Sequence, residues 1–170
     1  MKLRDPRILV CGTLKGRGIE ILEMAGCDVD YQPEHKPGSL ADVIEPFAGV
    51  IVHSHHFVDA ATINAGSALR VVGRAGAGVD NIDVQAATEA GVLVMNLPWG
   101  NTITAAEHTV ALMLALARNI PQASAALRAG TWDRKPYLGV ELSGKILGVI
   151  GLGRIGREVV RRAHVFEMQV

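Results

Sequence analysis

The sequence is poor in aromatic residues and carries no net charge. Aromatic side chains make up 4% of its 170 residues, so the core has to be built from Val, Ile, Leu and Ala. Seventeen basic residues balance 17 acidic ones, which gives no electrostatic sign of a nucleic-acid or anionic-membrane partner. With 49% hydrophobic and 20% charged residues, the composition predicts a folded globular protein rather than a disordered one.

Cysteines and long apolar segments are also scarce. Cys11 and Cys27 are the only cysteines, and their spacing fits neither a disulfide framework nor a zinc site. We therefore expect two reduced core thiols and a cytoplasmic location. The first residues lack the apolar stretch of a signal peptide. The longest apolar run, 110–117, is much shorter than the roughly 18 residues of a membrane span, so we expect no membrane association.

Short apolar runs alternate with helical segments over the first part of the chain. Such alternation predicts a parallel sheet with helices on both faces, and continuous apolar runs are typical of strands buried on both sides. Ser39, Asp59 and Asp83 are the expected N-caps of three of the helices. We expect strands at 7–11, 29–31, 49–52, 69–73 and 92–95, and helices at 16–25, 39–46, 60–65 and 83–91.

Pro98 and Gly100 interrupt this alternation. We therefore predict two domains, one at 1–98 and one from 99 to 170. The capping-box spacing of Thr104 and Glu107 predicts the start of a helix that runs to about Arg118. Because this helix is rich in Ala and Leu almost all round, we expect it to be buried at a domain junction or a subunit interface. Another helix is expected at 121–130, followed by irregular structure.

A glycine-rich turn follows residues 145–150, which have the composition of a strand. Gly151, Gly153 and Gly156 form a G-x-G-x-x-G pattern, and residues 157–166 are typical of a helix. The first glycine permits a tight turn, the second lets a pyrophosphate approach the backbone, and the third lets helix and strand pack closely. Unpaired amides at the helix start can then bind phosphates. The pattern predicts a dinucleotide site; the alternative is a glycine-rich turn without a ligand.

The acidic residue that would bind the ribose is expected about 20 residues after this pattern. Glu158 and Glu167 come too early for that role, and Val170 stands where the next strand would begin. The 170 residues therefore do not distinguish NAD from NADP.

Several stretches resemble one enzyme family. Residues 72–83, 100–109 and 116–123, with the glycine-rich turn, resemble the D-isomer-specific 2-hydroxyacid dehydrogenases, and within them the phosphoglycerate dehydrogenases. The similarity covers most of residues 48–170. It implies an α/β fold: a flavodoxin-like parallel-sheet lobe that binds substrate, followed by the start of a Rossmann NAD-binding domain. It also implies NAD as cofactor, a small 2-hydroxyacid as substrate, and a homodimer or homotetramer.

The resemblance implies particular site residues as well. It makes Arg74 and Asn101 substrate contacts, but Arg74 could instead be a solvated loop arginine, and Asn101 could simply shape the turn before its helix. The family's catalytic His, its partner Glu and a substrate-orienting Arg correspond to positions downstream of the glycine-rich helix, so no catalytic residue is assigned to this chain. The implied substrate contacts are His53, Ser54, Arg74, Gly76, Gly78 and Asn101, and the implied cofactor contacts are Ala77, Gly151, Gly153, Arg154, Ile155 and Gly156.

Two positions depart from the family pattern. The family commonly has arginine where His53 stands, and a neutral histidine puts the binding of a substrate phosphate in doubt. Glu167 stands where the family tends to have glycine, and a left-handed backbone there would cost about 1 kcal/mol.

The histidines raise a separate question. His53, His55 and His56 could be metal ligands, cleft residues or ordinary strand-end histidines, and we expect no metal because no carboxylate lies at close ligand spacing. His108 lacks the H-E-x-x-H context of a zinc ligand and is expected to serve helix packing or an interface.

Three hypotheses about function remain open. The first is NAD-dependent oxidation of D-3-phosphoglycerate to 3-phosphohydroxypyruvate, in serine biosynthesis, by a longer enzyme of which this chain is an amino-terminal fragment, inactive alone. The second is a dehydrogenase for another 2-hydroxyacid, such as glyoxylate or a lactate-like acid, as His53 suggests. The third is a non-catalytic ligand-binding or dimerising module built on residues 1–98 and the apolar helix.

Overall fold

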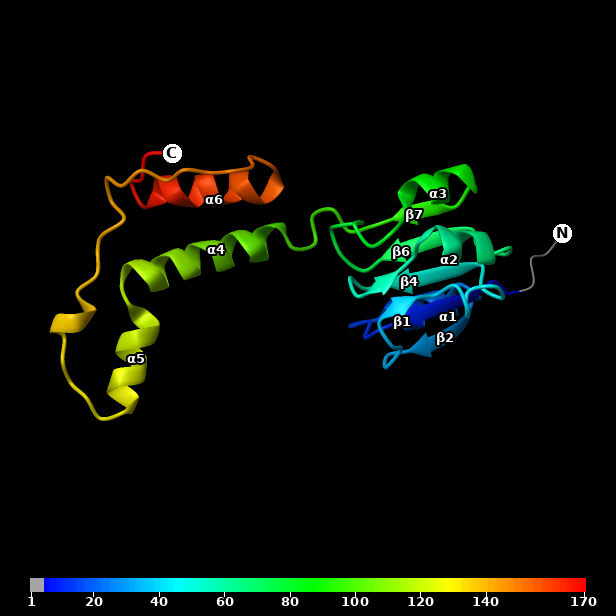
Figure 1. Ribbon diagram of the computed structural model, residues 1–170, viewed down its shortest axis with the longest axis horizontal. Coiled ribbons are helices and arrows are strands. Elements are labelled where there is room, and N and C mark those ends of the chain that lie inside the picture. Colours follow the sequence, from blue (N-terminus) through cyan, green and yellow to red (C-terminus); the bar gives the residue numbers. More distant parts are fainter. Residues whose placement is uncertain (1–4) are drawn as a thin grey trace. The chain divides into compact units, whose positions relative to one another are not determined.

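The computed structural model describes residues 5–170, which form two compact units that divide after Gly100. The first unit is built on a five-stranded parallel sheet in the order β2-β1-β4-β6-β7 (Figure 1). This is the flavodoxin-like strand order once the two short strands β3 (Gly38–Ser39) and β5 (His56–Phe57), which form a separate sheet, are set aside, so the predicted fold class is confirmed. The five strands are β1 (Arg7–Cys11), β2 (Asp28–Gln32), β4 (Gly49–Val52), β6 (Val71–Arg74) and β7 (Leu93–Met95).

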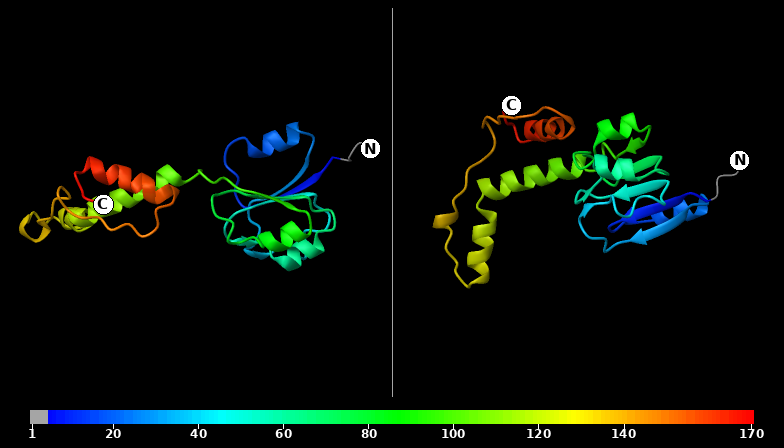
Figure 2. Two further views of the ribbon diagram at one scale, coloured as in Figure 1. Left: turned by 90° about the horizontal axis from the view of Figure 1, so that it is seen from above. Right: turned by 45° about the vertical axis from the view of Figure 1, so that its right-hand side comes forward.

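Helices lie on both faces of this sheet. Figure 2 (left) shows α1 (Gly18–Met24) on one face, with α2 (Ala60–Ala65) and α3 (Val84–Glu89) on the other. The predicted caps of α2 and α3 are confirmed, because Asp59 accepts a hydrogen bond from the Thr62 amide at 2.8 Å and Asp83 accepts one from the Ala86 amide at 2.9 Å.

The predicted helix at 39–46 is wrong. The segment starts with β3 (Gly38–Ser39), which pairs in parallel with β5 (His56–Phe57), and continues as turns. The Ser39 hydroxyl donates to Asp59 at 3.3 Å instead of capping a full helix. Leu40 and Ile44 are both fully buried. Burial of these apolar side chains under the sheet therefore overrides the local capping signal.

The main core lies on the α2 and α3 face, where the described side chains are closely packed. It is formed by Leu9, Cys11, Leu40, Ile44, Phe47, Val50, Val52, Val58, Ile63, Leu69, Val72, Ile82, Ala87 and Val92.

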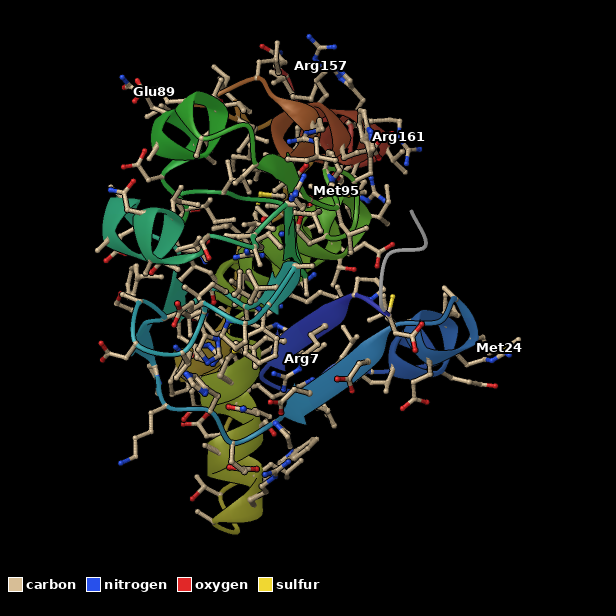
Figure 3. All side chains as sticks on the ribbon, turned by 90° about the vertical axis from the view of Figure 1, so that its right-hand side faces the viewer. Arg7, Met24, Glu89, Met95, Arg157 and Arg161 are labelled. Atoms are coloured by element: carbon tan, nitrogen blue, oxygen red, sulfur yellow. The ribbon has the colours of Figure 1, made fainter. Side chains whose placement is uncertain are left out.

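The opposite face of the sheet is only partly covered. The strands were predicted to be buried on both faces, and this is correct only for the face that carries α2 and α3. Beside α1, a cavity of about 410 Å³ is left, and its lining includes Leu22, Ile51, Val71 and Met95. Figure 3 shows Met24 of α1 and Glu89 of α3 on opposite sides of this unit.

The two cysteines differ in burial. Both are free, but only Cys11 is buried, so the expectation of two core thiols is correct for Cys11 and wrong for the half-buried Cys27. Burial, helped by the nearby Asp30 carboxylate, raises the pKa of the Cys11 thiol to about 11. Cys11 therefore stays a protonated, unreactive core residue near neutral pH.

The second unit is mainly helical. It contains α4 (Thr102–Ala117), α5 (Ile120–Arg128), a 3₁₀ turn (Lys135–Tyr137) and α6 (Arg154–Val165). Helices α4 and α6 pack together, as Figure 1 shows. The buried apolar side chains of this unit are Ala106, Val110, Val159, Ala163 and Met168.

Helix α4 starts earlier than predicted. It begins at Thr102 with Asn101 as the N-cap residue, so Thr104 is inside the helix and the predicted capping box is wrong. Leu112 is 58% exposed and Leu116 is 78% exposed, and burial of this helix at a domain junction or subunit interface stays a prediction. Within residues 5–170 no single helix is long and apolar enough to cross a membrane, but α4 and α5, bent by 64° at their break, meet the length and composition criteria as a pair.

The predicted strand at 145–150 is also wrong. Only Ile146 forms a bridge, with Gln169, through the bonds from Leu147 N to the Gln169 carbonyl (2.8 Å) and from Gln169 N to the Lys145 carbonyl (2.9 Å). A strand needs a longer ladder of partner residues, and among the described residues this segment has a single short one.

Glu167 has the left-handed backbone that its departure from the family pattern led us to expect, with φ of 57°. Its carboxylate accepts a hydrogen bond from the Ser143 hydroxyl at 2.8 Å, and its carbonyl accepts one from the Gly144 amide at 3.0 Å. These two bonds offset part of the cost of about 1 kcal/mol for a non-glycine residue there.

Candidate functional site

The first group of candidate residues lies at the carboxyl edge of the sheet. Strand β4 ends at Val52, directly before His53 and Ser54, and its neighbour β6 ends at Arg74. Val52 and Arg74 are register partners, and the Ala75 amide donates to the Val52 carbonyl at 2.9 Å. In open parallel sheets this edge is where ligands bind, so the fold brings these predicted substrate contacts to a suitable place.

The loop after β6 is held in a fixed shape. A Cβ at Gly76 would overlap the guanidinium of Arg74, so the absence of a side chain there lets Arg74 fold over the loop. Asn96 donates to the Ala77 carbonyl at 2.7 Å, and the Leu97 amide donates to the Gly76 carbonyl at 2.9 Å. The Arg74 side chain thus lies against a constrained loop, and its buried Nε has no hydrogen-bond partner. This geometry disfavours the alternative of a freely solvated arginine.

Asn81 organises the neighbouring loop, although sequence reasoning did not single it out. Its side-chain amide donates to the carbonyls of His53 (3.0 Å) and His56 (2.7 Å), which belong to the segment after β4. Asn81 is buried, and a buried amide with two backbone acceptors is a rigid clamp. The only feature of the sequence that could have indicated Asn81 is its position within residues 72–83, the stretch that resembles the family.

Four histidine rings form a continuous run at this edge. His53 stacks on His55 with centroids 6.2 Å apart, His55 contacts His56 at 4.3 Å, and His56 contacts His35 at 5.6 Å. His56 is fully buried, and its Nε2 lies 3.2 Å from the His35 carbonyl. Burial lowers the pKa of His56, and the neighbouring histidines lower it further.

Gly12 makes room for these rings and was also missed. It follows β1 with φ of 86°, and a Cβ there would lie 2.7 Å from Cδ2 of His53 and 3.4 Å from Cε1 of His56. The loop after β1 therefore needs glycine for conformational and steric reasons together. Among residues 5–170, no group of three or more His, Cys, Asp or Glu side chains is arranged to hold a metal ion.

The second group of candidate residues is the glycine-rich turn before α6. Gly151 has φ of 93°, and a Cβ on Gly156 would overlap the Gly151 carbonyl oxygen. Gly153 is the N-cap of α6, and a Cβ there would meet no described atom within 4 Å. The three glycines thus match the tight turn, the open approach and the close packing that a dinucleotide-binding turn requires.

The helix start after this turn suits an anion. Arg154 and Ile155 form the first residues of α6, and the Arg157 side chain donates to the Leu152 carbonyl at 3.2 Å, which ties the turn to the helix. No side chain of the described residues caps the helix, and no described atom lies within 4 Å of a Cβ built on Gly153, which leaves room for a ligand at the start of α6. The residues present therefore fit the diphosphate of a nicotinamide dinucleotide.

The remaining predicted contacts are separated between the two units. Ser54, Ala77 and Gly78 lie with Arg74 in the first unit, whereas Asn101 begins the second. Asn101 is exposed, and its side chain makes no capping hydrogen bond. The roles of all these residues stay predictions.

Comparison with known proteins identifies the family. Residues 8–163 match the D-isomer specific 2-hydroxyacid dehydrogenase, catalytic domain. This chain belongs to that family.

The most informative relatives are one curated enzyme and two solved structures. The D-3-phosphoglycerate dehydrogenase of Methanocaldococcus jannaschii is 49% identical over 96% of this chain and 31% of its own length. The TT0316 protein of Thermus thermophilus superposes with a TM-score of 0.86 at 34% identity, over 95% of this chain and 54% of its own. An acyclic imino acid reductase, Bsp5, solved with NADPH and D-Arg, gives 0.85 at 26% identity, over 96% and 54%.

This chain therefore spans about a third of the length of the curated relatives that it matches. Its relationship to 2-hydroxyacid dehydrogenases is established, and the resemblance first inferred from the sequence stretches is confirmed.

Proposed function

We propose that this chain is the amino-terminal part of an NAD-dependent enzyme that oxidises D-3-phosphoglycerate to 3-phosphohydroxypyruvate. Residues 1–98 would form the substrate lobe, and residues 99–170 would begin the dinucleotide domain. The observation that carries the proposal is the glycine geometry at 151–156, with open space beside Gly153 at the start of a helix that no described side chain caps. The 49% identity to a phosphoglycerate dehydrogenase supports the choice of substrate.

Each residue would contribute a separate part of the reaction. The amides at the start of α6 would bind the diphosphate, and Arg74 with the loop at 75–78 would bind the substrate anion. A bound nicotinamide dinucleotide would supply the acceptor for the hydride of the carbon that carries the hydroxyl group, and the hydroxyl proton would require a base. Because we assign no base to these 170 residues, we expect no turnover by this chain alone.

The test compares two glycine substitutions by calorimetry with NAD and NADH. Gly153→Ala places a methyl group where no described atom lies within 4 Å, so thermal stability should not change. Dinucleotide binding should nevertheless weaken at least about tenfold, because the methyl group occupies the approach of the diphosphate. Gly148→Ala is the matched control, since a Cβ there also meets nothing within 4 Å. Unchanged binding by Gly153→Ala, or no binding by the original chain, would contradict the proposal.

A second candidate function is dehydrogenation of a different 2-hydroxyacid, which is favoured by His53 at the position where the family commonly has arginine. The NADPH-bound imino acid reductase illustrates that this architecture also serves a different substrate and the phosphorylated cofactor. Steady-state rates of the intact polypeptide with phosphoglycerate and with glyoxylate, each with both cofactors, distinguish the candidates. A clear preference for phosphoglycerate would exclude the second one.

Self-association and location complete the proposal. We infer a homodimer or homotetramer in which α4 contributes its exposed apolar surface, and a cytoplasmic enzyme, with which two free cysteines are compatible. Sedimentation velocity tests the first point: Leu112→Glu with Leu116→Glu should shift the chain toward monomer, while Thr104→Glu, exposed on the same helix, should not.

A further inference from the structure

We propose that Arg162 is a positioning residue for the dinucleotide: by joining α6 to Glu107 of α4, it holds the start of α6 in a fixed place relative to α4. The inference rests on the dinucleotide site of the proposed function, and it names a residue outside that site which sets its geometry. It gives a role to an ion network on α6 to which none of the predicted site contacts belongs.

The guanidinium of Arg162 connects two helices of the second unit. Its Nη1 donates to the carbonyl of Glu158 at 3.0 Å and also to the Glu158 carboxylate, one turn back on α6. Its Nη2 lies 3.6 Å from Oε1 of Glu107 on α4, and the Arg162 side chain is only 18% exposed. Because Glu158 already holds the guanidinium in one orientation, pairing with Glu107 costs little further side-chain entropy.

The apolar contact between the two helices is made by short side chains. The buried apolar residues are Ala106 and Val110 on α4, and Val159 and Ala163 on α6. Short side chains form shallow ridges, so they bring two helices together without fixing how one slides or tilts along the other. A cavity of about 350 Å³ lies beside Glu107 and Arg162 and is lined by both helices, so packing is incomplete where the ion pair stands. The ion pair therefore supplies the direction that the apolar contact lacks.

The direction of α6 matters because of what lies at its start. Helices α4 and α6 run side by side in the same direction, so their first residues lie at the same end of the pair (Figure 1). Helix α4 starts after Asn101, and α6 starts after Gly153 in the dinucleotide turn. At about 1.5 Å per residue, Gly153 lies about 14 Å from Arg162 along the helix. A tilt of about 5° at Arg162 would move the turn by about 1 Å, enough to weaken a ligand held by several aligned groups.

Glu107→Gln separates positioning from simple electrostatics. At 3.6 Å the contact with Arg162 depends on charge rather than on a hydrogen bond, so glutamine loses it. Removing a negative charge would by itself strengthen the binding of an anionic dinucleotide. Positioning predicts the opposite sign, and calorimetry should show NADH binding weakened by about threefold to tenfold. Thermal stability should stay nearly unchanged, because the Glu107 side chain is 65% exposed.

Arg161→Gln is the matched control on α6. Arg161 pairs with Glu158 at 2.9 Å and its side chain is 65% exposed, so this change removes a charge from the same network while Arg162 keeps its partner Glu107. NADH binding should change by less than about twofold.

A double-mutant cycle tests whether Arg162 acts through Glu107. Arg162→Gln should weaken NADH binding, and Glu107→Gln added to it should weaken binding little further, because both changes remove one contact. If Arg162→Gln does not fold, the exposed Glu107 variant and its control still decide the matter.

Backbone amide NMR of the chain without dinucleotide gives an independent readout. The signals of Gly153 and Gly156 should shift in Glu107→Gln and stay in place in Arg161→Gln, because only the first change releases α6 from α4.

The inference is overturned if Glu107→Gln binds NADH as tightly as the original chain or more tightly, or if the two glycine amides do not respond to it. Dinucleotide binding by the original chain that needs Gly153 would then leave the proposed function standing. If the original chain binds no dinucleotide, the proposed function fails, and this inference fails with it.

Discussion

At both candidate sites, glycines stand where another group of the chain comes too close to leave room for a side chain. Gly12 makes room for His53, Gly76 for the Arg74 guanidinium and Gly156 for the carbonyl of Gly151. At each position an added methyl group would collide with a group that the proposed chemistry needs. Such residues are easy to find in a sequence, but the atoms they accommodate belong to other parts of the chain.

Gly156→Ala is expected to lower the free energy of unfolding. Alanine gains about 1 kcal/mol over glycine in a helix interior, but overlap with a backbone oxygen costs about 1–3 kcal/mol or more because that oxygen cannot move aside freely. The net effect should be destabilising, and chemical denaturation of the second unit measures it. Gly148→Ala is the control and should change stability by less than about 0.5 kcal/mol. A stabilised Gly156→Ala variant would show that the helix start moves away from the turn.

The buried His56 predicts a pH-dependent stability in the absence of anions. Burial lowers the pKa of His56 in the folded chain below its unfolded value of about 6.5. Between these two values the unfolded chain binds more protons, so stability is complete above about pH 6.5 and declines as the pH falls toward the folded pKa. Urea unfolding across this range checks the sign, and His56→Gln should flatten the slope. A stability that rises as the pH falls through this range would contradict the assignment.

At the scale of elements, capping decides where short helices begin. Helix α2 has only six residues, too few to be stable alone, so its N-cap and its packing have to supply the stability. Asp59 accepts from both the amide and the hydroxyl of Thr62 at 2.8 Å, and from Ser39 at 3.3 Å. One carboxylate thus joins α2 to β3 as well as capping the helix.

Asp59→Ala should cost about 1–2 kcal/mol, whereas Asp59→Asn, which keeps an acceptor, should cost less. The amide of Thr62 lowers the pKa of Asp59, so the charged cap stabilises the fold above its unfolded pKa of about 3.9 and is lost as the pH falls through the lowered value. Denaturation of the three proteins at neutral and acidic pH tests this. Equal acid sensitivity of the original chain and the Asn variant would contradict the role of the charge.

Element prediction from sequence succeeded where the local signal and the tertiary environment agreed. The strands at 7–11 and 49–52 were found because their apolar runs are buried in the parallel sheet. The helix predicted at 39–46 failed because Leu40 and Ile44 are buried through turns instead. The strand predicted at 145–150 failed because strands depend on partners, and here the only described ladder contact is Ile146 with Gln169.

At the scale of the whole molecule, the two units differ in how much core they contain. The first unit has a continuous cluster of 14 buried residues, which spans the sheet and two helices. The second has a smaller set of buried apolar side chains, Ala106, Val110, Val159, Ala163 and Met168, and its Leu112 and Leu116 are exposed. Local opening should therefore be much easier in the second unit.

Hydrogen exchange of the chain followed by mass spectrometry should reveal this difference. Amides of β1, β4 and β6 are expected to exchange at least about tenfold more slowly than those of α4 and α6, because their ladder lies against the larger core. At rising protein concentration α4 should gain protection if it lies in a subunit interface. Uniform protection across both units at low concentration would show that they unfold together.

Some residues of the candidate sites could be identified from the sequence, and others only from the structure. The three glycines at 151–156 were identified from a local pattern, since the turn chemistry of glycine depends on its own backbone, whereas Arg74 and Gly76 were implied by the family resemblance. Asn81 and Gly12 were missed, because their partners His53 and His56 come from distant segments.

The sequence by itself determined the family, through the stretches that resemble it. It also determined the parallel α/β fold of the first unit and the backbone requirements of the glycine-rich turn, because local composition and spacing specify these two. Only the tertiary structure decided that four histidines share one sheet edge and that two of their buried nitrogens lack partners among the described residues. Pairing between strands remote in the chain brings those rings together, and no local pattern encodes that pairing.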